Sequence, residues 1–438
     1  MKDSGIKWIG SIPDTWNVIK VKYHCSLKGR IGWQGLTTDE YVDEGPFLIT
    51  GTDFNVNDGV INWDSCMHVS EWRYDQAPEI QVHNGDLLIT KDGTVGKVAI
   101  VTNIVDKTTL NSGVMVIRPK EDAYETKFLY YVLKSEEFWK WFHYINSGNT
   151  TISYLYQHDL NHFYYAITDR AEQRAIIEFL DQKCQQADVI IGKVKEQIEL
   201  LHRARASFIS RGTTRGSAQD CQLVETRNRW FPQVPPNWKV MRLKYACEKI
   251  TDGSHFSPAL QEEGETYITV TNIHEGKVHV DEGSKILAAD YEKLVRAGCQ
   301  PAIGDVLLTK DGTIGRTAIV ETNNYVLLSS IAILTPTKEV LPKYLQYALD
   351  SHLSQMQMLD SKGGSALQRI TLTKIYNYFI AVPPVEEQRN IIKHLDEKCS
   401  VIDRIMKEKQ NELNILEKQK KSLINEYITG KKRVKGYA

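Results

Sequence analysis

The sequence predicts an α+β protein with an internal repeat, in which two similar mixed α/β domains are separated by two long helices that form a coiled coil. Three observations lead to this fold class. Segments of the first half return in the second half at one offset of 215 residues. A heptad pattern marks the end of each half. Short β-rich runs bounded by Gly, Pro and polar residues fill the remainder.

The long helices are expected at residues 169–212 and 384–430. In the first segment apolar side chains alternate at spacings of three and four from Ile177 to Phe208. The second seam runs from Ile392 to Leu423 and is interrupted by two lysines, Lys409 and Lys420. Seams of this length predict that each helix packs along another helix. About 40 helical residues at ~1.5 Å each make a rod of roughly 60 Å.

Both helices carry start signals. Asp169, followed three residues later by Glu172, resembles a capping box. Pro384 puts a proline at the start of the second helix, and acids follow it in the first turn. Cys184 and Cys399 occupy equivalent seam positions, where a thiol is expected to pack as a small apolar side chain.

The rest of the chain divides into domains at 1–168 and 230–383, a linker at 213–229 and a basic tail at 431–438, which is typical of a solvated end. Each domain is expected to open on a strand, at 16–25 and 238–247, after a proline turn. Helical apolar spacing recurs at 127–133 and 343–349. Small polar loops follow at 147–151 and 362–366, just before the long helices.

The sharpest local repeat pairs residues 84–101 with residues 303–320. In each copy two β-branched runs flank a Lys-Asp-Gly-Thr turn, which predicts a hairpin. The turn also presents lysines, a threonine hydroxyl, flexible glycines and a second cation, groups that suit phosphate oxygens or base edges. A hairpin tip can serve both roles. The candidate contacts are Lys91, Asp92, Gly93, Thr94, Gly96 and Lys97 in the first copy, and Lys310, Asp311, Gly312, Thr313, Gly315 and Arg316 in the second.

Polar residues follow a short β-rich run in each half. Thr52 and Asp53 follow the run at 47–49, and Thr271 and Asn272 follow the run at 267–269. Such residues usually make only a turn, so a role in contacting base edges is the less specific of the two interpretations.

Composition bounds the function classes. The chain has 438 residues, 42% hydrophobic and 25% charged, which fits two or three globular domains without a fibrous or disordered class. No apolar run reaches membrane length and no signal core follows Met1, so a cytoplasmic location is expected. Residues 170–216 hold 9 basic and 6 acidic residues and residues 385–438 hold 13 and 9, so the helices together with the basic tail carry a surplus of seven positive charges. With a net charge of −1, the globular parts are acidic on average.

Catalytic and metal motifs are missing. The seven cysteines never approach a C-x-x-C spacing, and no Walker motif or H-E-x-x-H pair occurs. His158 and His162 are spaced i, i+4, but no Cys or acidic partner recurs in the other half, so no metal site is expected. No catalytic residue and no cofactor are therefore assigned to this chain.

The duplicated order of these motifs resembles the specificity subunit of type I restriction-modification systems, and the resemblance covers nearly the whole chain. A Pro-x-x-Trp opening, Gly-Asp-Leu-Leu-Ile-Thr-Lys-Asp-Gly-Thr-Val-Gly, a Gly-rich loop and Glu-Gln-Arg-x-Ile-Ile-x-x-Leu-Asp carry it. The resemblance implies that each domain is a target recognition domain reading one part of a split double-stranded DNA site. It implies that the two long helices pair antiparallel as spacers, which makes the internal repeat pseudo-two-fold. It also implies two modification subunits and restriction subunits as partners, with S-adenosylmethionine, ATP and Mg used by those partners.

Polar residues at the helix starts are candidates for contacting a partner subunit, although capping and local ion pairs account for them equally well. They are Glu172, Gln173, Arg174, Glu387, Gln388 and Arg389. Two other function classes stay open at this point: a coiled-coil structural or adaptor protein without DNA specificity, and an unrecognised nuclease. The target sequence, the half-site spacing and the methylated base cannot be read from these residues.

Overall fold

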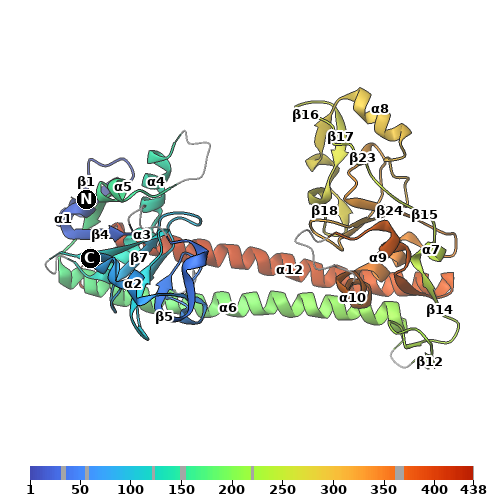
Figure 1. Ribbon diagram of the computed structural model, residues 1–438, viewed down its shortest axis with the longest axis horizontal. Coiled ribbons are helices and arrows are strands. Elements are labelled where there is room, and N and C mark those ends of the chain that lie inside the picture. The colour runs from blue at the N-terminus through green and yellow to red at the C-terminus, as the bar shows by residue number, and fades with distance from the viewer. Residues whose placement is uncertain are drawn as a thin grey trace. The chain divides into compact units, whose positions relative to one another are not determined.

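The computed structural model describes residues 1–30, 36–54, 59–120, 124–147, 154–218, 221–360 and 369–437. The chain forms two compact units: unit 1 comprises Met1–Lys195 and Asn411–Ala438, and unit 2 comprises Glu196–Gln410. Two long helices, α6 (Arg170–Arg215) and α12 (Val385–Ile428), each contribute one part to either unit (Figure 1). The expected polar loops lie outside the described residues, apart from Ser147.

Within each unit the two helix segments pair antiparallel, as expected. In unit 1, Lys420 Nζ lies 2.7 Å from Asp188 Oδ2, and Lys195 Nζ lies 3.3 Å from Glu417 Oε1 further along. The residue number therefore rises along one helix while it falls along the other. In unit 2, Arg205 pairs with Asp403 at 2.9 Å.

The predicted seam is correct in the middle of the helices and shifts at their ends. Ile191 and Val194 are buried, and so are Cys184 and Cys399, where burial raises the pKa of both thiols. Lys420, which interrupts the seam, is accommodated by its ion pair with Asp188. At the end of α6, Ile209 is buried and Phe208 is 37% exposed, because Ile209 joins the hydrophobic core of unit 2.

Unit 1 is a mixed α/β unit. Its four-stranded antiparallel sheet has the order β4-β10-β7-β8, and a three-stranded sheet of order β6-β5-β9 pairs β5 and β9 in parallel. β11 pairs with β3, and β1 pairs with β2. The strands are β1 (Lys2–Asp3), β2 (Ser11–Ile12), β3 (Asn17–Lys20), β4 (Cys25–Gly29), β5 (Tyr41–Ile49), β6 (Met67–Val69), β7 (Leu87–Thr90), β8 (Val98–Ile100), β9 (Thr108–Leu110), β10 (Val114–Pro119) and β11 (Tyr164–Ile167).

Helices pack on the unit 1 sheets, and α3 contacts β7 and β8 (Figure 1). The core of this unit includes Ile176 and Leu180 from α6 and Ile424 from α12, so the long helices are part of it. The α-helices are α1 (Val21–His24), α2 (Glu71–Asp75), α3 (Thr126–Lys134), α4 (Glu136–Ile145) and α5 (Gln157–Asn161), and the 3-10 helices are η2 (Thr38–Glu40), η3 (Trp63–Ser65) and η4 (Pro78–Ile80).

Unit 2 repeats this topology. Its antiparallel sheet has the order β15-β24-β21-β22, a second sheet has the order β16-β20-β17-β23 with β17 and β23 parallel, and β14 pairs with β25. Its strands are β12 (Val224–Glu225), β13 (Gln233–Val234), β14 (Lys239–Arg242), β15 (Cys247–Asp252), β16 (Leu260–Gln261), β17 (Glu265–Ile268), β18 (Ile273–His274), β19 (Lys277–Val278), β20 (Ser284–Ile286), β21 (Val306–Thr309), β22 (Thr317–Ile319), β23 (Tyr325–Leu327), β24 (Ile331–Pro336) and β25 (Phe379–Val382). Its helices are α7 (Leu243–Ala246), η5 (Val270–Asn272), η6 (Val280–Glu282), α8 (Ala288–Arg296), α9 (Pro342–Asp350), α10 (His352–Asp360) and α11 (Leu372–Tyr376).

The matching order of sheets confirms the predicted internal repeat of mixed α/β domains. The helices expected at 127–133 and 343–349 are α3 and α9. The expected opening strands are shorter than predicted, because one-turn helices, α1 and α7, follow β3 and β14. Each turn carries the chain from a two-stranded ribbon into the main sheet. No helix in the described part of the chain has an apolar stretch long enough to cross a membrane.

One buried carboxyl makes the stability of unit 1 depend on pH. Glu137 on α4 is 2% exposed, its Oε1 has no hydrogen-bond partner among the described residues, and burial raises its pKa to about 8. In the unfolded chain the pKa of a glutamate is about 4.3. Between these values the unfolded chain has released a proton that the folded chain still holds, so stability should fall as the pH rises from about 4.5 to 8.

Glu137→Gln removes this proton linkage. Urea unfolding should be measured at pH 5 and at pH 8. From pH 5 to pH 8, the free energy of unfolding of the variant should rise relative to that of the wild type by on the order of 3 kcal/mol. Glu136→Gln is the matched control, because the neighbouring Glu136 side chain is 51% exposed. Parallel pH profiles for the wild type and Glu137→Gln would contradict this assignment.

Candidate nucleic-acid interface

The two predicted hairpins are present. β7 pairs antiparallel with β8 in unit 1, and β21 pairs antiparallel with β22 in unit 2. A buried threonine at the end of the first strand closes each turn: Thr90 Oγ1 donates to Thr94 O (2.6 Å) and accepts from Lys97 N–H (3.0 Å). Thr309 makes the same two bonds to Thr313 O and Arg316 N–H. The turn therefore has one defined conformation in each unit.

The exposed part of each turn is small and polar. Gly93 and Thr94 are exposed in unit 1, and Gly312, Thr313 and Arg316 are exposed in unit 2. Gly93 and Gly312 have φ of 60° and 64°, a left-handed conformation that favours glycine. These glycines therefore shape the turn, and the residues after them present the hydroxyls.

The two lysines lie deeper than expected. Lys310 is 3% exposed, and its Nζ lies 3.0 Å from Asp252 Oδ2 at the end of β15. Lys91 is half-buried, and burial lowers its pKa. The expectation that Lys310 is exposed is wrong, because a buried ammonium requires a charged partner and Asp252 supplies it. Lys91 as a nucleic-acid contact stays a prediction.

The turn aspartates are turned toward neighbouring loops. Asp311 Oδ2 lies 3.2 Å from Arg369 Nε, and the two residues also form an isolated β-bridge. The carboxylate of Asp92 lies against Gly113, where the side chain of any larger residue would clash with it. Burial raises the pKa of Tyr154, and the negative charge of Asp92 raises it further. Both aspartates help to hold the turns, and the charge of Asp311 is paired with Arg369, which makes it less repulsive to a polyanion.

The turns at residues 50–53 and 269–272, which we call the threonine turns, have the same hydrogen bonds in both units. Asp53 is 1% exposed and accepts from Thr50 N–H at 2.7 Å, and Asn272 is 5% exposed and accepts from Thr269 N–H at 2.9 Å. Their side-chain oxygens are occupied inside the turn, which favours the turn interpretation over base contact for these two residues. Thr52 and Thr271 are exposed.

The structure brings the hairpin tip and the threonine turn together in each unit. Lys97 Nζ donates to Gly51 O over 2.9 Å, and Arg316 Nη1 donates to Ile273 O over 3.3 Å. We call the set so formed the tip surface; all of its residues are exposed except Lys97, which is half-buried. It consists of Thr52, Gly93, Thr94 and Lys97 in unit 1, and of Thr271, Gly312, Thr313 and Arg316 in unit 2.

The second glycine of each turn is a packing residue. Gly96 has φ 82° and lies so close to Trp139 of α4 that a Cβ would stand 2.6 Å from the indole. Gly315 lies equally close to Gln355 of α10, whose Nε2 donates to Gly315 O over 2.9 Å. These glycines attach the turn to a helix, and their contribution to ligand binding is indirect.

Gly96→Ala should therefore cost more stability than the backbone conformation alone explains. Gly85→Ala is the matched control, because Gly85 has φ 91° but nothing within 4 Å of an added Cβ. The control should lose about 1–2 kcal/mol for the left-handed conformation. Gly96→Ala should lose roughly 1–3 kcal/mol more for overpacking against the rigid indole. If urea unfolding showed equal losses of unfolding free energy for the two variants, the Trp139 indole would have moved aside without cost, which would contradict this prediction.

Three of the six residues expected to contact a partner subunit are buried, and for these three the expected exposure is wrong. Glu172 and Gln173 are each 1% exposed, and Gln388 is 0% exposed. Glu172 and Glu387 accept from the indole N–H of Trp16 and Trp238, each over 3.0 Å.

The two glutamines act in the same way at both helix starts. Gln173 Oε1 accepts from Glu125 N–H over 2.9 Å, and Gln388 Oε1 accepts from Leu341 N–H over 2.8 Å. They fasten α6 and α12 to α3 and α9. Arg174 and Arg389 keep exposed side chains, at 65% and 63%, although Arg174 pairs with Glu125.

The helix starts contain further repeated contacts that were not predicted from the sequence. Tyr131 OH donates to Asp181 Oδ1 over 2.7 Å, and Tyr347 OH donates to Asp396 Oδ1 over 2.6 Å. Both tyrosines and both aspartates recur in the repeat, and this recurrence is the signal that could have found them.

The basic tail also contacts unit 1: Arg433 Nη2 lies 2.7 Å from the buried Glu172 Oε1, so this part of the tail is bound to unit 1.

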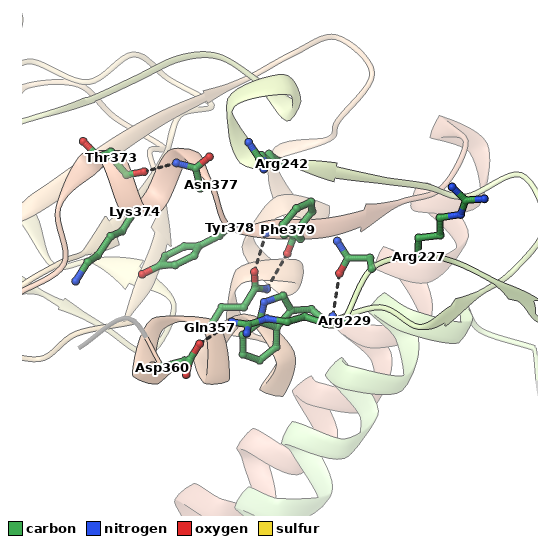
Figure 2. Close-up of a pocket in the computed structure, with 12 residues that line it drawn as sticks. Arg227, Arg229, Arg242, Gln357, Asp360, Thr373, Lys374, Asn377, Tyr378 and Phe379 are labelled. Carbon is green, nitrogen blue, oxygen red and sulfur yellow. Dashed lines mark hydrogen bonds and ion pairs between the residues drawn. The ribbon is translucent and has the colours of Figure 1, made fainter. Parts of the chain in front are cut away.

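A basic pocket of about 660 Å³ lies in unit 2. Arg229 lies over the Trp230 ring and pairs with Asp360 at 2.8 Å, while Arg242 lies over Phe379. Figure 2 shows Gln357 bonded to the backbone of Phe379 beside Arg229, and Lys374 at the opposite side. Arg227, Arg229, Arg242 and Lys374 against Asp360 make the pocket suited to an anion. Arg227 and Arg229 belong to the segment expected to be a linker, so no site was predicted there.

The fold defines a class of protein: a tandem-repeat protein of two similar mixed α/β units, each of which has a polar tip surface. The chain belongs to the family described as type I restriction modification DNA specificity domain, whose model matches residues 14–200 and 235–415, one match in each half. The recognition of this family from the sequence is thereby confirmed.

Individual relatives agree with this membership. The chain is 24% identical to a putative type I restriction enzyme MjaX specificity subunit of Methanocaldococcus jannaschii, over 98% of this chain and 96% of that protein. It is 24% identical to the type I restriction enzyme EcoBI specificity subunit of Escherichia coli, over 77% of this chain and 72% of that protein. A chain solved in work on complex assembly and conformational transition of the type I R-M system has the same fold, with a TM-score of 0.65, 16% identity and coverage of 95% and 98%.

Proposed function

We propose that this protein is the recognition subunit of a type I restriction-modification complex, and that it binds a bipartite double-stranded DNA site. Each unit reads one half-site through its tip surface. The chain supplies no catalytic group, and the modification and restriction subunits supply the chemistry. The proposal places the protein in the cytoplasm, where its DNA and its partner subunits meet.

The observation that carries this proposal is the duplication of the tip surface. The same closed turn and the same threonine turn occur in both units, and a cation bonds the first turn to a backbone carbonyl of the second, Gly51 O in unit 1 and Ile273 O in unit 2. The cations differ: the half-buried Lys97 in unit 1 is replaced by the exposed Arg316 in unit 2. A common framework with different side chains suits two different half-sites, because phosphate contacts fix position while base contacts specify sequence.

The chemistry of the tip surface fits a duplex. Threonine hydroxyls donate to phosphate oxygens or to base edges, and arginine pairs with guanine in the major groove. The glycines let the backbone approach closely. We extend the proposed contacts to Lys91, because its half-buried ammonium lies within the same turn. Lys310 supports the turn through Asp252.

We propose that α6 and α12 fix the spacing of the two half-sites. A helical segment of 46 residues, as in α6, measures about 69 Å at ~1.5 Å per residue. Since a base pair rises ~3.4 Å, about 20 base pairs is the upper limit of the separation. Two half-sites more than one turn apart lie within this limit.

The proposed complex contains two modification subunits and restriction subunits besides this chain. S-adenosylmethionine, ATP and Mg belong to those partners. The globular parts are acidic on average, so we expect this chain alone to bind DNA weakly and the modification subunits to add basic surface. The exposed Arg174 and Arg389 are the candidates that remain, from the helix starts, for contact with those subunits.

Fluorescence anisotropy of a labelled duplex tests the proposal. The duplex carries the site mapped from methylated DNA, and the titration is repeated with and without the modification subunits over a salt series. We expect tight, sequence-dependent binding only with the partner present. An absence of preference among duplexes in both titrations would favour an adaptor protein, and metal-dependent cleavage by the isolated chain would favour a nuclease.

A further inference from the structure

A short hairpin in unit 2 brings two histidines together beside the tip surface. β18 (Ile273–His274) pairs with β19 (Lys277–Val278), and the turn residues Glu275 and Gly276 have φ of 52° and 72°. Positive φ at both central residues is the pattern of a tight two-residue hairpin turn. His279 N–H donates to Asn272 O over 2.9 Å and extends the pairing, so the His274 and His279 side chains fall on one face of the ribbon.

A glutamate completes the cluster. Glu282 is at the end of η6, and Asn272 Nδ2 donates to its carbonyl oxygen over 2.9 Å. Its carboxylate reaches both rings: Oε2 lies 3.1 Å from His274 Nε2, and Oε1 lies 3.7 Å from His279 Nδ1. One nitrogen or oxygen atom of each of the three residues lies within 4.8 Å of the other two.

We propose that His274, His279 and Glu282 form a structural site for a divalent transition-metal ion of the zinc type. Two imidazoles and one carboxylate are a ligand set that Zn²⁺ uses in proteins, with bonds of about 2.0–2.2 Å. Tetrahedral bonds of that length place ligand atoms roughly 3.3 Å apart, close to the 3.1 and 3.7 Å that separate the Glu282 oxygens from the nitrogens of His274 and His279. This group was not singled out from the sequence, because a His-x₄-His spacing without an accompanying Cys pair is a weak signal for zinc.

Two further observations favour a cation. His279 Nε2 is buried and has no hydrogen-bond partner among the described residues, which is rare for a buried polar atom. His279 and Glu282 also line a pocket of about 490 Å³ in which Asp281 and Glu321 add two more carboxylates against the single cation of Lys277. The pocket that leads to the cluster is therefore negatively charged, which favours the entry of a cation.

The rings must turn to bind an ion. The two imidazoles are stacked, with centroids 3.5 Å apart and planes 12° apart, so their ring-plane lone pairs do not meet at one point. Rotation about the Cβ–Cγ bond of one histidine brings them together, and that torsion is soft. An ion would then replace the stacking and the hydrogen bond to Glu282.

The site would connect the hairpin to η6 directly below the tip surface. Arg316 donates to Ile273 O, next to His274, and Asn272 already bonds to Glu282. Metal binding would stiffen the part of unit 2 that positions Thr271 and Arg316. Metal binding itself is independent of the proposed function, and only this coupling to DNA rests on it.

Isothermal titration of the full, untagged chain with ZnCl₂ tests the site, after dialysis against a chelator. We expect one strong site per chain, and titration with CoCl₂ should give the absorption of tetrahedral Co²⁺. His279→Ala and Glu282→Gln should weaken zinc binding by roughly 100-fold or more, since loss of a ligand exceeds the 10–100-fold effect of outer residues. His158→Ala is the control, because His158 and His162 form a histidine pair in unit 1 with ring centroids 4.6 Å apart.

Circular dichroism separates loss of the site from loss of folding, and His274→Gln is the second variant if His279→Ala fails to fold. Zinc should raise the melting temperature of the wild type and leave that of the variants unchanged. Stoichiometric binding that survives in His274→Gln and Glu282→Gln, or no binding by the wild type, would overturn the site. DNA binding measured with and without zinc is a separate readout: its failure to respond would overturn only the coupling.

Discussion

Replacing Glu172 with alanine is expected to destabilise unit 1 by about 3–5 kcal/mol, the cost typical of removing one partner from a buried charge pair. Glu172 is 1% exposed and bonds three groups. Trp16 Nε1–H donates to Oε2 over 3.0 Å, Thr168 Oγ1–H donates to the same oxygen over a short distance, and Arg433 Nη2 lies 2.7 Å from Oε1. The substitution would leave an arginine, an indole and a hydroxyl without their acceptor.

Urea unfolding at pH 7 measures this loss, with Glu178→Ala as the matched control on the exposed side of the same helix. Glu387→Ala in unit 2 is a second comparison. Glu387 is half-buried and bonds Trp238, so a loss of about 1–2 kcal/mol is expected there. A Glu172→Ala loss no larger than that of Glu178→Ala would mean that α6 and the tail are not held by this carboxylate.

Replacing Arg316 with alanine is expected to weaken binding of the site by about 1–3 kcal/mol in the presence of the modification subunits. Arg316 is the exposed guanidinium of the unit 2 tip surface, and its bond to Ile273 O orients it beside Thr271. Arg296→Ala is the control, because Arg296 on α8 has a 78% exposed side chain paired with Glu292.

The effect should be confined to one half-site. With duplexes in which either half is scrambled, Arg316→Ala should change binding only where the half-site read by unit 2 is intact. If Arg316 contacts a base, the variant should lose selectivity at one position of the half-site. If Arg316 contacts a phosphate, the slope of the logarithm of the binding constant against the logarithm of the salt concentration should fall by about 1. An equal loss on both duplexes, or no loss, would remove Arg316 from the interface.

Most of the fold was predictable because the repeat and the heptad seams are long-range patterns. α6 was expected at 169–212 and runs over Arg170–Arg215. The shift of the seam from Phe208 to Ile209 could not be predicted, since it depends on the core of unit 2 that Ile209 enters. The expected antiparallel pairing already implied that the end of α12 would pack beside the start of α6, and residues from Asn411 onward do belong to unit 1.

The site was predictable in outline. The sequence located both hairpin tips, because a Lys-Asp-Gly-Thr turn between β-branched runs is a local signal. It did not indicate that Lys310 would be buried, because that depends on Asp252, which lies far away in the sequence on β15. Glu172, Gln173 and Gln388 were expected on the surface for the same reason: polar residues at a helix start are usually exposed, and tertiary partners reversed this here.

The most direct test of the central claim is to map methylated positions in DNA from cells that carry the complete system, with wild-type protein and with Arg316→Ala. We predict a motif of two specified parts separated by unspecified base pairs, and a variant motif that is altered in one part alone. A single uninterrupted motif, or a variant in which both parts change together, would contradict the account of two units that each read their own half-site.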